Sequence, residues 1–184
     1  RTMAMQKSDE LPDAANLLFQ QMQTLGLPAW SAGYCIWDKD KQGITLWMSS
    51  EGVIQPPFHA PLNEDPSFVH MREAYEKGEN FHVEAVGGDE LVSHYKYMRT
   101  LPVVGRILDS IIDAGHPLPV FQIMHCAYFS QGFLLFITYE PMPQAWDIFK
   151  RFSNVFEQTD TRFLALQKAE VQPREAHIET ALER

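Results

Sequence analysis

The stretch VFQIMHCAYFSQGFLLFITY, residues 120–139, decides the fold class of this chain. It holds two nearly continuous apolar runs, 120–129 and 133–139, which are separated by the polar break 130–132. Aromatic and β-branched residues dominate both runs, and the glycine in the break is typical of a hairpin turn. Strands that are apolar at almost every position are buried on both faces. We therefore predict an antiparallel hairpin at the centre of a sheet.

Other segments upstream have the composition of strands. Residues 30–37 and 44–49 are rich in aromatic and β-branched side chains, and the polar residues 38–43 between them predict a second hairpin. Residues 80–86 predict a short strand that closes at a pair of glycines. The proline-rich residues 52–63 predict an irregular loop instead, because proline is unfavourable in a helix interior and in an inner strand. The result is an antiparallel sheet of five or six strands.

Helices are predicted in the middle of the chain by their end signals. Asp65, followed by a proline, is a typical helix start, and Gly78 is a typical helix end. Asp89 predicts the cap of the next helix, which Pro102 interrupts. A further helical stretch stops at Gly115.

Helical patterns also occupy both ends of the chain. Apolar residues recur at steps of three and four over 11–25, and a heptad-like spacing runs from Ala145 to Leu166. We expect the part of this long helix from Phe149 to Phe156 to lie on the sheet, because bulky phenylalanines favour docking on a sheet. The order of elements predicts an α+β fold, with the terminal helices on one face of the sheet and the middle helices on the other.

The composition argues against several classes of partner. Fifteen lysines and arginines against 24 aspartates and glutamates give a net charge of −9, which repels nucleic acid and anionic membranes. No apolar run approaches the roughly 20 residues that span a bilayer, and the start lacks a signal-peptide pattern. We therefore expect a soluble, cytoplasmic domain that binds neither nucleic acid nor membrane.

The two cysteines, Cys35 and Cys126, each lie within an apolar run that predicts a strand. Buried free thiols in a reducing compartment are the favoured interpretation. A redox activity is the alternative, and it requires that the two strands be neighbours.

The order of elements resembles that of the GAF family over roughly residues 11–170. Members of this family place an antiparallel sheet against their first and last helices and use the other face as a small-molecule pocket. The resemblance therefore implies a pocket between the sheet and the middle helices. A PAS-like domain is the alternative.

The ends of the chain resemble the helical joints that flank GAF-like domains in bacterial multidomain sensor histidine kinases and related signalling regulators, notably those of Bacteroidetes. The matching stretches are RTMAMQKSDEL, residues 1–11, and EAHIETALER, residues 175–184. This implies an N-terminal joint over 1–10, a sensory domain over 11–172 and a C-terminal joint over 173–184. The chain starts at an arginine rather than a methionine and ends within a helical pattern, so we expect it to belong to a longer protein with an output domain in cis and a homodimer formed through the terminal helices.

Motifs for catalysis, metal binding and phosphate binding are absent from the sequence. The seven histidines are scattered, and neither a H-E-x-x-H nor a C-x-x-C pattern occurs. His82-Val83-Glu84 matches part of the zinc deaminase signature, but its cysteine motif is missing. Histidine kinase phosphoacceptor and ATP-binding motifs are also missing, so we expect no enzymatic activity in this chain, and no cofactor is specified.

Six residues combine apolar bulk with a polar tip, as the walls of small-molecule cavities do. The predicted ligand-binding residues are Trp37, Trp47, His82, Tyr95, Gln122 and His125. The leading hypothesis is a sensory input domain that binds an unidentified small molecule or partner and signals through its terminal helices. The alternative is a ligand-free dimerisation or spacer module.

Overall fold

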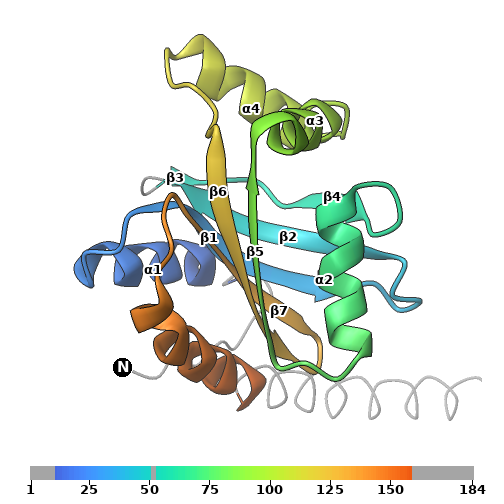
Figure 1. Ribbon diagram of the computed structural model, residues 1–184, viewed down its shortest axis with the longest axis vertical. Helices are drawn as coiled ribbons and strands as arrows, with labels where there is room; N and C mark the ends of the chain where they lie inside the picture. Colours follow the sequence, from blue (N-terminus) through green and yellow to red (C-terminus); the bar gives the residue numbers. More distant parts are fainter. Residues whose placement is uncertain (1–10, 51–52, 159–184) are drawn as a thin grey trace, which may run out of the picture.

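The computed structural model describes residues 11–50 and 53–158, and it has the predicted α+β fold (Figure 1). The predicted joints 1–10 and 173–184, and the helix beyond residue 158, lie outside the described residues. The elements, in chain order, are α1 Leu11–Thr24, β1 Ala29–Trp37, β2 Gly43–Ser50, β3 Val53–Ile54, β4 Phe58–Pro61, α2 Pro66–Glu76, β5 Phe81–Gly87, α3 Gly88–Met98, α4 Val104–Asp113, β6 Phe121–Phe129, β7 Gly132–Thr138 and a 3₁₀ turn Pro143–Ala145. The chain is again helical over residues 146–158.

The strands form one antiparallel sheet in the order β3-β2-β1-β7-β6-β5. The predicted central hairpin is confirmed, because β7 lies between β1 and β6 and both strands of the hairpin are buried along most of their length. The short strand β4 pairs with β2 outside this order.

The prediction of an irregular loop over 52–63 is wrong for β3 and β4. In β4 the side chains of Phe58 and Ala60 are buried and that of His59 is exposed, which is strand alternation over a very short run. The prolines lie before β4 and at its last residue, so none interrupts the pairing with β2. The run was too short for this alternation to stand out from the prolines around it.

The helix signals of the sequence are largely confirmed. Asp65 caps α2 by accepting hydrogen bonds from the backbone N–H groups of Ser67 at 3.1 Å and Phe68 at 3.4 Å. The prediction of Asp89 as a cap is wrong, because β5 runs directly into α3 and Gly87 occupies the cap position. Gly88 has a φ of +57°, a conformation that glycine adopts readily. The chain can therefore turn sharply from strand to helix at this residue, and the helix starts before Asp89.

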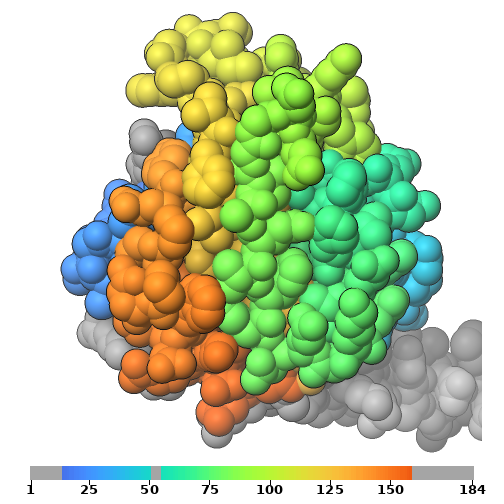
Figure 2. Space-filling model, in the orientation of Figure 1, coloured from blue at the N-terminus to red at the C-terminus, as the bar shows by residue number. Residues whose placement is uncertain are grey.

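Helices cover both faces of the sheet as predicted (Figures 1 and 2). The terminal-helix core lies between the sheet and the helical residues 14–22 and 149–156; its strand residues are Ala32, Tyr34, Ala127, Phe129, Leu134 and Phe136. The middle-helix core lies between the opposite face and α2, α3 and α4; its residues from β1, β6 and β7 are Cys35, Trp37, Met124, Cys126, Tyr128, Phe133 and Leu135. Neighbouring residues of one strand thus face different cores. No helix in the described part of the chain is long and apolar enough to cross a membrane.

Candidate functional site

A cavity of about 70 Å³ lies in the middle-helix core, between the sheet and helices α2, α3 and α4. Its walls are mainly apolar. They consist of Trp30, Ser31, Leu46, Met48, Ser50, Gln55, Phe58, Phe68, Met71, His94, Tyr95, Met98, Val104, Ile107, Leu108, Ile111, Gln122, Met124, Leu135 and Ile137. The half-buried residues of the cavity wall are Gln55, Ile107, Ile111 and Ile137, so the cavity approaches the surface at α4 as well as beside β3 and β7.

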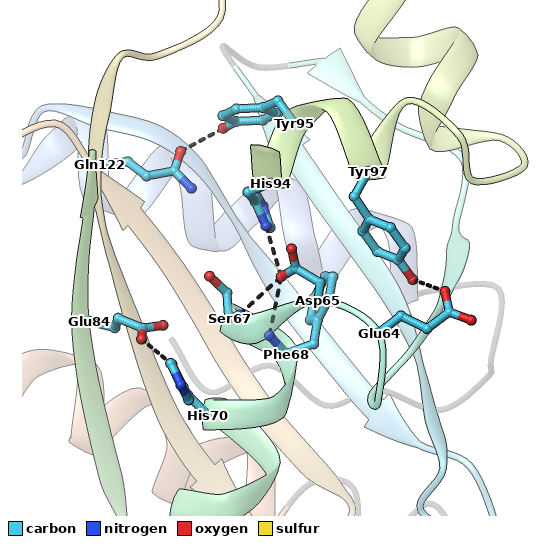
Figure 3. Close-up of polar contacts among 10 residues, drawn as sticks. All are labelled: Glu64, Asp65, Ser67, Phe68, His70, Glu84, His94, Tyr95, Tyr97 and Gln122. Carbon is cyan, nitrogen blue, oxygen red and sulfur yellow. Dashed lines mark hydrogen bonds and ion pairs between the residues drawn. The ribbon is translucent and has the colours of Figure 1, made fainter. Parts of the chain in front are cut away.

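Gln122 on β6 is the most buried polar side chain in the cavity wall, with no exposed surface. Its Oε1 accepts a hydrogen bond of 2.5 Å from the hydroxyl group of Tyr95 on α3 (Figure 3). Its amide nitrogen Nε2 has no hydrogen-bond partner. A buried donor without a partner is unfavourable by about 1–3 kcal/mol, so this nitrogen is the chemically unsatisfied atom of the cavity.

The orientation of the Gln122 amide follows from its contact with Tyr95. The Tyr95 hydroxyl group lies 2.5 Å from the Gln122 oxygen, and an amide oxygen can only accept a hydrogen bond. Burial raises the pKa of Tyr95 far above its ordinary value, so the phenol keeps its proton. That proton points to the Gln122 oxygen, and the Gln122 nitrogen is left without an acceptor.

A buried Asp65–His94 pair stands beside the cavity and ties α3 to the start of α2. Nδ1 of His94 lies 3.0 Å from Oδ2 of Asp65, and both side chains are less than a tenth exposed (Figure 3). The ring of His94 packs against Phe68 and Tyr95. An aspartate that orients a histidine also occurs in catalytic triads. Here neither cysteine lines the cavity, so the pair has no thiol nucleophile beside it.

An acidic cleft of about 540 Å³ lies on the outer side of His94. It contains the hydrogen bond from Tyr97 to Glu64, of 2.6 Å, and the short contact between His70 and Glu84 (Figure 3). Within residues 11–50 and 53–158, no three His, Cys, Asp or Glu side chains are placed to hold a metal ion. The cleft is therefore acidic without the ligand geometry of a metal centre.

The structure brings only Tyr95 and Gln122 of the six predicted ligand-binding residues into the cavity. Trp37 faces the same core but is packed between the rings of Tyr75 and Phe133, away from the cavity. His82 lies on β5 opposite Cys126 and does not line the cavity either.

Trp47 and His125 belong to the opposite face of the sheet. Trp47 stacks on Tyr34, with ring centroids 5.2 Å apart, and His125 packs against Phe149. The strand faces could not be assigned from the sequence, since a shift of one residue exchanges them. In β6 the even-numbered residues face the cavity side, so Gln122 and His125 point in opposite directions.

The thiols are not placed for redox chemistry with each other. Strand β7 separates β1, which carries Cys35, from β6, which carries Cys126, and both cysteines are free and buried. Burial raises the pKa of each thiol, so the reactive thiolate is disfavoured. The strands are therefore not the neighbours that a redox pair requires.

Four methionines of the cavity wall were not among the predicted binding residues: Met48, Met71, Met98 and Met124. The sequence contained a partial signal, because Met71 and Met98 lie on the apolar faces of helices that it predicted. Periodicity identifies such a face, but it does not distinguish a packed core from a cavity wall.

No protein-family model and no curated protein sequence matches this chain.

Proposed function

We propose that this chain is a non-catalytic, GAF-like sensory domain of a signalling protein, which binds a small molecule in the cavity beneath α4. The observation that carries this proposal is the unpaired amide nitrogen of Gln122, on a side chain with no exposed surface in the cavity wall. A ligand that accepts a hydrogen bond there would satisfy this group. An apolar cavity with one or a few polar groups is the usual form of a small-molecule site.

The arrangement of the sheet supports a route for the signal. Gln122 and Met124 of β6 face the cavity, whereas Ala127 of the same strand faces the terminal-helix core. A ligand that moves β6 would therefore also change the packing of helix 146–158, toward the C-terminal end of the chain. Such a ligand must bind two states of the domain with different affinity, because equal binding shifts no equilibrium.

Because the chain ends resemble the joints of sensor histidine kinases, we further propose that the domain belongs to a signalling protein of this kind. The output domain then lies in cis, the domain pairs with a second copy through its terminal helices, and the protein is cytoplasmic. The two free, buried cysteines fit a reducing compartment.

A ligand-free dimerisation or spacer module is the second candidate. The observation that favours it is the size of the cavity, about 70 Å³, against the roughly 300–1,000 Å³ of pockets for drug-sized ligands. On this reading Trp30, Phe58 and Phe68 simply fill the core.

A thermal-shift screen of the full 184-residue chain separates the two candidates. The panel contains nucleotides, amino acids, haem, flavins, bilins and neutral aromatic compounds. A ligand at 100 times its dissociation constant adds about 2.7 kcal/mol to the free energy of unfolding. The sensory proposal expects a dose-dependent rise in melting temperature, whereas a flat panel together with a dimer in light scattering would favour the spacer.

A further inference from the structure

We infer that the ligand is an uncharged, mainly apolar molecule with a hydrogen-bond acceptor, such as a ketone, an amide carbonyl or a ring nitrogen, bound against the Gln122 amide. This inference rests on the proposed function and specifies the chemistry of its ligand. Three properties of the cavity wall carry it.

The first property is the absence of charge. None of the residues that line the cavity is a lysine, arginine, aspartate or glutamate. The imidazole of His94 is held on Asp65, which lies outside the cavity lining. A charged ligand would lose its hydration on entering the cavity and find no opposite charge in the wall. Burying an unpaired charge is strongly unfavourable. Phosphates, carboxylates and zwitterionic amino acids are thus poor ligands.

The second property is the direction of the hydrogen bond. The Gln122 amide offers N–H groups that have no acceptor. The Tyr95 hydroxyl group already donates its hydrogen bond to the Gln122 oxygen. The Ser31 hydroxyl group donates to the backbone oxygen of Ser49 at 3.1 Å. The ligand must therefore accept, and an alcohol proton or an N–H of the ligand would not replace that acceptor.

The third property is the adaptable wall. Four flexible methionine side chains, from β2, α2, α3 and β6, surround the space beside Gln122. The thioether of methionine is polarisable, contacts aromatic rings favourably and repacks around irregular shapes. Such a wall can retract around a single ring, although the cavity of about 70 Å³ by itself holds only a few water molecules.

Methionine-methyl NMR tests this inference on the full chain. Three compounds of nearly the same shape serve as probes: acetophenone, which is neutral and has a carbonyl acceptor; α-methylstyrene, in which a CH₂ group replaces that oxygen; and benzoate, which is charged. The methyl groups of Met48, Met71, Met98 and Met124 report on the cavity. Met22 and Met142 lie in the terminal-helix core and report on the opposite face of the sheet.

Acetophenone is expected to shift the four cavity methyl resonances in a saturable way and to shift the methyls of Met22 and Met142 less, because those two sense the ligand only through the sheet. α-Methylstyrene should bind about tenfold more weakly, because it leaves the buried amide unpaired. Benzoate should give no shift at the same concentrations. Equal or tighter binding of α-methylstyrene or benzoate at these methyls would overturn the inference.

The double variant Gln122→Leu/Tyr95→Phe checks the assigned contact. It removes the amide and the hydroxyl group that pairs with it, so neither polar group is left without the other. Acetophenone should then bind no more tightly than α-methylstyrene. Undiminished preference for acetophenone in a folded variant would contradict the role of Gln122, and the comparison of probes on the unaltered chain remains decisive if the variant does not fold.

Failure of the inference is distinguishable from failure of the proposed function. If charged metabolites of the thermal-shift panel stabilise the chain and shift the cavity methyls, the function stands and the inferred chemistry is wrong. If no probe shifts these methyls, the inference is wrong, and a flat panel in addition would remove the support for the sensory function.

Discussion

Asp65 holds several groups together with a single carboxylate oxygen. Its Oδ2 accepts from two backbone N–H groups of α2 and lies 3.0 Å from the Nδ1 of His94. Asp65→Ala should lower the free energy of unfolding by about 2–4 kcal/mol, because it removes a helix cap and leaves a buried imidazole without its partner. Urea denaturation measures this loss.

The matched control for Asp65 is Asp113→Ala at the exposed end of α4. Removal of an exposed carboxylate at a helix C-terminus should change stability by less than about 0.5 kcal/mol. Asp65→Asn keeps an oxygen that can accept and should cost less than the alanine variant. Similar losses for Asp65→Ala and Asp113→Ala would show that the cap and the His94 contact contribute little.

His125 lies on the face of the sheet opposite the cavity, and we expect it to make the stability of the fold depend on pH. Its Nδ1 donates to the carbonyl oxygen of Phe136 at 3.0 Å, and its Nε2 is buried without a partner. Burial lowers the pKa of His125 below the ordinary value of 6.5, so the folded state resists protonation. As the pH falls below about 6.5, the unfolded chain takes up this proton first, and stability is progressively lost as the pH falls toward the lower folded-state pKa.

Urea denaturation between about pH 7.5 and pH 5 tests this effect against His125→Leu. The variant loses the hydrogen bond to Phe136 at every pH, but its stability should fall less steeply on acidification than that of the unaltered chain. His116 is exposed, so His116→Gln should keep the original slope. Parallel slopes for all three proteins would exclude His125 as the source of the pH dependence.

At the scale of elements, α3 and α4 meet in a tight junction beside the cavity. Val103 has φ 69° and ψ −66°, and the N–H of Val104 donates to the carbonyl of Pro102 at 2.8 Å, which is the rare and strained γ-turn. Gly105 follows immediately, and a Cβ atom there would lie 2.4 Å from the backbone oxygen of Arg99. The two helices approach each other too closely for a side chain.

Gly105→Ala should therefore lower the free energy of unfolding by about 1–3 kcal/mol, because backbone atoms have to move apart. Urea denaturation measures it, with the exposed Ser110→Ala of the same helix as the control. Since α4 covers the cavity, the alanine variant should also weaken the binding of any cavity ligand. A Gly105→Ala protein as stable as the control would mean that the junction is more pliable than its geometry indicates.

At the scale of the whole molecule, Phe149 fixes the helix over residues 146–158 to the sheet. It has no exposed surface and stacks on Phe136, with centroids 4.1 Å apart and planes 11° from parallel. Phe149→Ala should lower the free energy of unfolding by about 3–5 kcal/mol, as expected for a large buried ring. Phe152 of the same segment is only half-buried, so Phe152→Ala should cost less than half as much. Equal costs in urea denaturation would contradict this view of the docking.

The sequence was sufficient to predict the layers of the fold, since continuous apolar strands and capped helices have strong local signals. Asp65 with the following proline, and the hairpin over 120–139, are examples that the structure confirms. The cavity was only partly predictable. Tyr95 and Gln122 come together over 27 positions of sequence, and their meeting depends on the register of β6 and on the placement of α3. Neither is encoded in local spacing.

The central position of β7 has a consequence for how the chain acquires its structure. Its partner β1 lies more than ninety residues earlier, with Cys35 opposite Phe133. On a ribosome, the middle of the sheet cannot close until nearly the whole domain has been synthesised and has left the exit tunnel. Until then the edge of β1 that pairs with β7 has no partner. Pairing over such a separation in sequence is slow. We therefore expect the nascent chain to need chaperone protection until β7 emerges.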